Sequence, residues 1–279
     1  MGQIRRLVTS LVVIGLMLNG TGCMTTPPDD GGGNTEEAPK IPPTSTFVID
    51  FSDFEQNNDA DPVVRTRGVL PIENWGYAAG SVLFWNTVVT ITLAVPVGAF
   101  VESFNHEPTL NAQGIWSWEY DVVVNGVTYS AELQGQINGA NVNWNMFVSR
   151  EGDYTDFNWF SGTSNILGSE GSWSLNRDPD DPTSFVDIVY NVNEAAGTGD
   201  IRYTNVIPDH ADNGGFIFFG ISDDEPFDAS YEIYLPSSDQ TTDIEWSRDN
   251  KDGRVKNAMH FGDDEYHCWD ENLADIECP

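Results

Sequence analysis

From Gly114 onward the chain alternates between apolar and polar residues with a period of two, the pattern of β-strands that have one buried face. In "GIWSWEYDVVVNGVTYSAELQGQI" the alternate apolar positions run up to Val124. Asn125-Gly126 is then a strong two-residue hairpin signal, and the alternation resumes beyond it. The inward positions of this hairpin are Trp116, Trp118, Tyr120, Val122, Val124, Val127, Tyr129, Ala131 and Leu133.

Further short strands follow at intervals separated by turns. An Asn138-Gly139 turn leads into the run Val142, Trp144, Met146 and Val148, and later runs read "DFNWFSG", "GSWSLNR", "SFVDIVYNV", "DIRYTNV", "GGFIFFGI", "ASYEIYL", "TDIEWSR" and "GRVKNAM". A series of short strands joined by turns predicts an antiparallel meander. We therefore expect a mainly β fold, with a single domain over residues 47–279 that forms a curved sheet or a barrel.

The stretch from Val82 to Phe104 departs from this pattern, and no residue from Asn74 to Val101 is charged. A transmembrane helix is one interpretation of such a run, but threonines, Pro96 and a glycine dilute it. Its two faces are both largely apolar, which indicates a buried element. We predict a buried helix, kinked at Pro96, in the concave face of the sheet. A buried strand pair is the alternative, because alternate residues from Leu83 are apolar.

The N-terminal segment has the organisation of a signal peptide. Arg5 and Arg6 precede an apolar run, Leu7–Leu18, which is too short to cross about 30 Å of hydrocarbon as a helix. Small residues then lead to Cys23. This arrangement resembles the bacterial lipobox, in which the cysteine begins the mature protein and carries diacylglycerol on its sulfur and an acyl group such as palmitate on its amine. Gly20 stands where the usual box has leucine.

The resemblance implies that residues 1–22 are removed and that Cys23 is lipidated. It also implies a destination, since Met24 stands where an aspartate would favour retention at the inner membrane. We expect the protein at the cell outer membrane, held by its N-terminal lipid, because two or more acyl chains give a stable anchor. Residues 23–46, rich in proline, glycine and acids, are expected to be a disordered tether.

The chain has three cysteines, and lipidation of Cys23 would leave Cys268 and Cys278. In an oxidising compartment these two are expected to form a disulfide. A metal site made by this pair with His260 and His267 is the alternative.

Acidic residues far outnumber basic ones, 44 against 12, and the formal net charge is −32. Nucleic acid and anionic lipid head groups would be repelled, so we exclude both as partners of the folded domain. The acids form three clusters, which are either calcium ligands or a solvated surface. The clusters are Asp178, Asp180 and Asp181; Asp223, Asp224 and Glu225; and Asp263, Asp264 and Glu265.

The sequence lacks the common catalytic motifs. It has no Gly-x-Ser-x-Gly elbow, Walker loop, dinucleotide fingerprint or His-Glu-x-x-His. A glycosidase would need two carboxylates across a cleft, which the sequence cannot identify among 44 acids. We assign no catalytic residue, metal ligand or cofactor.

The tryptophan-rich strands have three interpretations. Exposed Trp144, Trp159 or Trp173 could stack on sugar rings; the rings could instead line a lipophilic cavity, as in lipocalin-like or lipoprotein-carrier folds; or they could form the core. Their alternation with aliphatic residues favours the core or a cavity.

The ending "HFGDDEYHCWDENLADIEC" and the motif "LAVPVGAF" resemble a group of acidic, β-rich bacterial lipoproteins to which no activity is assigned. We therefore predict a non-catalytic outer-membrane lipoprotein that binds an apolar ligand or an envelope protein. A surface carbohydrate-binding module and a polysaccharide hydrolase are the alternatives.

Overall fold

The computed structural model describes residues 37–48 and 73–279. The predicted signal peptide, Cys23 and the tether up to residue 36 lie outside the described residues. Residues 38–279 form one compact unit.

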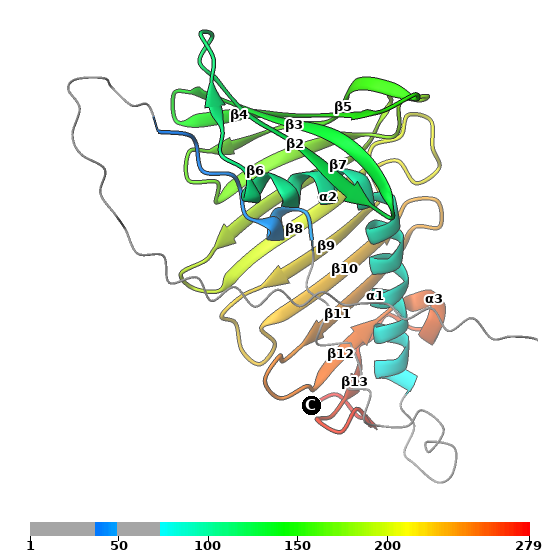
Figure 1. Cartoon of the computed structure of the whole chain (residues 1–279). Helices are drawn as coiled ribbons and strands as arrows, with labels where there is room; N and C mark the ends of the chain where they lie inside the picture. Colours follow the sequence, from blue (N-terminus) through cyan, green and yellow to red (C-terminus); the bar gives the residue numbers. More distant parts are fainter. Residues whose placement is uncertain (1–36, 49–72) are drawn as a thin grey trace, which may run out of the picture. The chain divides into compact units, whose positions relative to one another are not determined.

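The unit is built on one antiparallel sheet of 14 strands in which every strand pairs with its neighbours in sequence (Figure 1). This confirms the predicted mainly β meander. The sheet is not closed, because β1 and β14 each pair on one side only. The barrel alternative is therefore wrong. The strands are β1 (Thr109–Leu110), β2 (Ile115–Val124), β3 (Val127–Asn138), β4 (Asn141–Arg150), β5 (Tyr154–Asn165), β6 (Glu170–Asn176), β7 (Ser184–Asn193), β8 (Thr198–Asn205), β9 (Phe216–Ile221), β10 (Ala229–Leu235), β11 (Gln240–Trp246), β12 (Gly253–Lys256), β13 (His267–Trp269) and β14 (Asp275–Ile276).

The first hairpin shows how the sequence sets the register. Asn125 and Gly126 have φ values of 51° and 80°, which suit a tight turn between β2 and β3. The turn pairs Val124 with Val127, and Tyr120 then faces Ala131 across the ladder. The predicted inward positions from Trp118 to Leu133 accordingly lie on the buried side, while the residues between them are more exposed.

The segment predicted as a helix or a strand pair is helical. It forms α1 (Glu73–Thr92) and α2 (Ala94–Glu102), followed by the short 3₁₀ turn η4 (Ser103–Asn105). The chain breaks at Leu93, and the axes on either side differ by 70°. Pro96 lies in the first turn of α2, where its missing N–H leaves no hydrogen bond unmade.

Among the described residues, no single helix has the length and apolar character needed to cross a membrane. The bent pair Glu73–Thr92 and Ala94–Asn105 passes that test by length and composition alone.

Helix α1 is only partly buried, contrary to our prediction. Its first half buries Trp75, Ala78 and Val82, whereas in its second half the side chains of Phe84 and Ile91 are 60% and 72% exposed. The helix is apolar on all sides, and only one side can face the sheet. An apolar sequence therefore did not bring full burial here.

The start of α1 is held by the end of the sheet. The N–H groups of Glu73 and Asn74 donate to the Asp275 carboxylate of β14, over 3.1 and 3.0 Å. The side chain of Asn74 donates to the carbonyl of Cys268 in β13 at 2.8 Å. A carboxylate at this position satisfies the free N–H groups of a helix N-terminus and complements its dipole.

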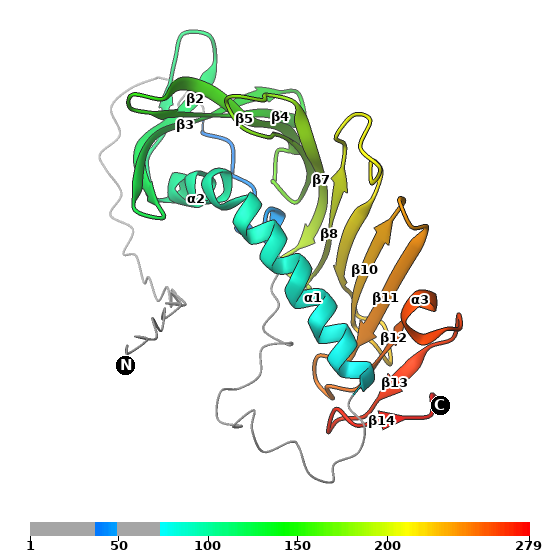
Figure 2. The same cartoon turned by 90° about the vertical axis from the view of Figure 1, so that its right-hand side faces the viewer.

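Helix α2 lies in the concave side formed by the first strands, and β2 to β5 arch over it (Figure 2). Its Phe100 is fully buried and belongs to a cluster of aromatic rings with Phe47, Phe160 and Trp173. The Phe47 and Trp173 rings are stacked, with centroids 4.9 Å apart. This cluster fills the space between α2 and the sheet.

The end of the predicted tether belongs to the folded unit. Residues 44–46 form a 3₁₀ turn, η1 (Thr44–Thr46), and Thr46 is fully buried. Trp173 Nε1 donates to Thr46 Oγ1 at 3.4 Å, and the Tyr203 hydroxyl donates to the Phe47 carbonyl at 2.9 Å. Residues 38–46, the end of the predicted tether, therefore belong to the same compact unit as the sheet. Within this part of the predicted tether, Pro39 and Pro42 are buried.

Candidate functional site

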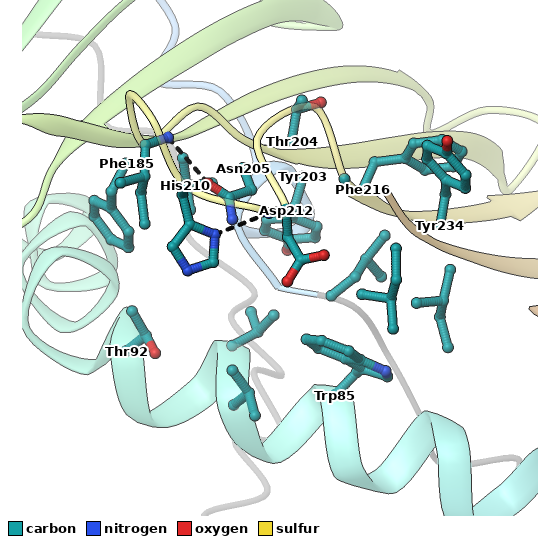
Figure 3. Close-up of a pocket in the computed structure, with 18 of the residues that line it drawn as sticks. Trp85, Thr92, Phe185, Tyr203, Thr204, Asn205, His210, Asp212, Phe216 and Tyr234 are labelled. Atoms are coloured by element: carbon teal, nitrogen blue, oxygen red, sulfur yellow. Dashed lines mark hydrogen bonds between the residues drawn. The ribbon is translucent and has the colours of Figure 1, made fainter. Parts of the chain in front are cut away.

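An apolar pocket of about 310 Å³ lies between the second half of α1 and strands β7 to β10 (Figure 3). It opens to solvent on one side. Ligand sites for small molecules typically start at about 300 Å³ and have mostly apolar linings. The lining residues are Trp85, Val88, Val89, Thr92, Leu93, Phe185, Val186, Tyr203, Thr204, Asn205, Ile207, His210, Asp212, Gly215, Phe216, Ile217, Ile233, Tyr234 and Leu235.

The floor of the pocket is a row of side chains across neighbouring strands. Tyr203 of β8 pairs with Ile217 of β9, which in turn pairs with Ile233 of β10. Directly paired residues point to the same face of a sheet, so the three side chains form a continuous surface under α1. The Tyr203 hydroxyl is occupied by its bond to Phe47, and this floor is therefore apolar.

The roof of the pocket is one side of α1. Trp85, Val88, Val89 and Thr92 follow the spacing i, i+3, i+4 and i+7, which places them on one face of a helix. Leu93, at the bend before α2, is buried and closes one end of the roof. The contacts of α1 with the sheet are concentrated on β12, β13 and β14, beneath its first half. The second half stands away from β8 to β10, which leaves the pocket.

A polar group of residues borders the pocket in the loop between β8 and β9. The backbone N–H of Asp212 donates to His210 Nδ1 at 3.1 Å, and Asp212 Oδ1 accepts a hydrogen bond from the Ser237 N–H at 3.0 Å. Hydrogen bonding from Ser237 holds the pKa of the Asp212 carboxyl below its usual range, so this group is ionised at neutral pH. Figure 3 shows His210 and Asp212 projecting from the strand side toward α1.

The three tryptophans predicted as sugar-stacking candidates are buried. Trp144 and Trp173 are fully enclosed, and Trp159 is 9% exposed. Trp144 Nε1 donates to Ser164 Oγ inside the domain. The core interpretation is therefore right for these rings, and the prediction of a stacking platform on them is wrong. Trp85, which sequence reasoning did not single out, is the tryptophan that lines the pocket.

The C-terminal cysteines form the predicted disulfide, Cys268–Cys278, with Cα atoms 5.2 Å apart. This removes the alternative in which their thiolates bind a metal. His267 Nε2 lies 3.0 Å from Asp263 Oδ1, and its ring stacks on Phe261. The His260 ring stacks on Tyr77 of α1 at 3.8 Å. Both histidines thus have structural contacts.

The first acid cluster forms a hydrogen-bonded turn. Asp178 Oδ1 accepts from the N–H groups of Asp180 and Asp181, and Asp181 also pairs with Arg177. Within residues 37–48 and 73–279, no group of three or more His, Cys, Asp or Glu side chains is placed to hold a metal ion. The solvated-surface interpretation describes the first cluster, and the calcium alternative has no site among the residues described.

Comparisons with protein-family models, with curated proteins and with solved structures gave no match to this chain. The case for a function therefore depends on the pocket and on the sequence itself.

Proposed function

We propose that the protein binds a single-chain lipophilic or amphipathic molecule in the pocket between α1 and β7–β10. The observation that carries the proposal is the pocket itself, an apolar space of about 310 Å³. The rest of the domain is packed with aromatic side chains, as interiors normally are. An apolar concave space with a few polar groups at its edge is the usual form of a small-molecule site.

The proposed role is binding rather than catalysis. His210 Nδ1 accepts a hydrogen bond from the backbone N–H of Asp212, so it does not face a side-chain nucleophile. A glycan is a poorer fit, because the candidate stacking tryptophans are buried and the pocket floor is apolar. We further propose that a lipid on Cys23 holds this binding domain at the outer membrane, as the resemblance to the lipobox implies.

The location is tested by native mass spectrometry of the protein extracted from its host membrane. We expect a mass that starts at Cys23 with added acyl groups, an intact disulfide and a retained apolar ligand. A mature protein without acyl groups would contradict the anchor, and it would leave the pocket to be tested on its own.

The pocket is tested with the neutral fluorescent probe N-phenyl-1-naphthylamine and the full chain carrying Cys23→Ser, which removes the predicted lipid. We expect saturable binding by this background. Val89→Glu, which puts a charge into the roof, should weaken binding by about tenfold or more, since burying an unpaired charge is costly. Ile91→Glu is the matched control, because it adds the same charge on the exposed side of α1. Absence of binding, or equal loss in both variants, would contradict the proposal.

A further inference from the structure

We propose that the pocket selects amphiphiles whose polar end is cationic or an uncharged hydrogen-bond donor, and that Asp212 is the residue that rejects anionic ones. This inference rests on the proposed function and specifies the class of ligand. It would distinguish the protein from a carrier of fatty acids or other anionic lipids.

The first support is the distribution of charge around the pocket. Among the described residues that line it, Asp212 carries the only carboxylate, and the lining contains no lysine or arginine. The remaining lining is aliphatic or aromatic apart from His210 and a few uncharged polar residues. A ligand whose chain lies on the apolar floor therefore meets a single fixed charge, and that charge is negative.

The second support is that the carboxylate is held in place. Asp212 Oδ1 is fixed by the Ser237 N–H at the turn between β10 and β11. The Asp212 carbonyl accepts from the Gly215 N–H at 3.0 Å, and the Asn213 N–H donates to the His210 carbonyl at the same distance. A loop braced in this way presents its charge without first having to be ordered, which is what favours selective binding.

His210 lies beside this carboxylate on the same loop. Its Nδ1 accepts a hydrogen bond from the backbone N–H of Asp212 over 3.1 Å, and this bond holds the ring against the loop.

The neighbouring arginine lies on the other face of the sheet. Arg202 is adjacent to Tyr203 in β8, and successive side chains of a strand point to opposite faces. Its guanidinium lies 3.4 Å from the centre of the ring of Phe216, which lines the pocket, but Arg202 itself is not among the lining residues. The chain as a whole adds to the negative field, with 44 acidic residues against 12 basic ones.

The test is competition against N-phenyl-1-naphthylamine in the Cys23→Ser full chain, with three ligands of equal chain length: decylammonium, decanol and decanoate. We expect decylammonium to displace the probe at a concentration about tenfold lower than decanoate, the size expected for one partly screened charge nearby. Decanol should fall between them. The preference should weaken as salt is added, because the charge is solvent-accessible.

Asp212→Asn keeps the hydrogen bond from Ser237 but removes the charge. We expect it to bring decylammonium and decanoate to within about threefold of one another, measured as the ratio of their displacing concentrations within this variant. Asp209→Asn is the matched control on the same loop. Asp209 does not line the pocket, and its φ of 59° is one that asparagine adopts readily. This control should keep the preference for decylammonium.

The outcomes separate the two proposals. Failure of both the probe and decanol to bind would overturn the proposed function. Binding of both without a preference for decylammonium, or with a preference that survives Asp212→Asn, would leave the pocket in place and overturn the role of Asp212.

Discussion

Helix α2 and the second half of helix α1 are both apolar, and each faces strands with apolar inward positions. Beneath α2 the space is filled, because Ala99 and Phe100 pack against a cluster that includes Phe47 and Trp173. Beneath the second half of α1 a space of about 310 Å³ is left open. The same sheet therefore supports a packed core at one place and a pocket at another.

The difference lies in where each helix is attached. Helix α2 contacts β2 and β4 directly, and residues 44–47 add a further layer between it and the sheet. Helix α1 is attached at its first turn to β13 and β14, and the bend at Leu93 fixes its other end. Between its first turn and Leu93, the second half of α1 passes over β8 to β10 without packing closely on them. An apolar helix thus covers a sheet closely only where small and large side chains fit together along its length.

The contrast between α2 and the second half of α1 predicts its largest effect on stability when an aromatic ring of α2 is removed. Phe100→Ala should lower the free energy of unfolding by about 3–5 kcal/mol, because it leaves a cavity among rings that cannot close around it. Phe84→Ala makes the same chemical change on α1, where the side chain is 60% exposed, and should stay within about 0.5 kcal/mol. Urea denaturation measures both. Equal losses would show that the two helices are equally packed.

A smaller effect is expected from one substitution made on each helix. Gly80→Ala on α1 adds a methyl group to open space and should raise the free energy of unfolding by about 0.5–1 kcal/mol through helix propensity. On α2, Gly98→Ala would place a Cβ 2.9 Å from Cγ2 of Val124, so the gain should be cancelled or reversed. Thermal unfolding of the pair gives the difference directly. A stabilised Gly98→Ala protein would mean that α2 can shift as easily as α1.

The smallest effect concerns the ion pair between Asp228, just before β10, and Arg248, just after β11. Burial alone would raise the pKa of Asp228, but the backbone N–H and the guanidinium of Arg248 outweigh it, and the pKa is lowered from the ordinary 3.8. A lowered carboxyl pKa stabilises the fold above the ordinary value and loses this contribution as the pH falls through the folded-state value. We expect a loss below about 1 kcal/mol.

This loss is checked by urea midpoints measured from neutral pH down through 3.8, the ordinary value for Asp228. Asp228→Asn should slightly flatten the acid side of the curve of stability against pH. Asp223→Asn, which removes the same charge at an exposed position nearby, is the control. If Asp228→Asn leaves the acid side of the curve of stability against pH unchanged, the ion pair between Asp228 and Arg248 is ruled out as a source of stability.

The strands could be predicted from the sequence because their information is local. Alternation in "IWSWEYDVVV" and the Asn125-Gly126 turn specify both a strand and its partner, and the disulfide Cys268–Cys278 followed from the count of cysteines. The edge strands β1 and β14 were missed, since two residues are too few to show a period. Alternation gives strand pairing but not closure, and the barrel alternative was wrong for that reason.

The residues that line the pocket could not be predicted, because they come from segments far apart in the sequence. The pocket forms only after the meander has folded and α1 has packed against it. Folding then brings together Trp85 of α1, Tyr203 of β8 and Asp212 of the loop between β8 and β9. No motif marks "PDHADNGG", the loop that supplies His210 and Asp212. The exposure of Ile91 could not be predicted from the sequence either. A helix that is apolar on all sides does not show which side will face the sheet.

The bond between Asn74 and Asp275 joins residues 201 positions apart. A helix that depends on so distant a carboxylate gains this partner only after the intervening sheet has assembled, which makes its docking a late event in folding. Helix α1, the roof of the pocket, would then be the last part of the domain to reach its native position. Substitutions that disrupt β14 would therefore weaken ligand binding before they unfold the sheet.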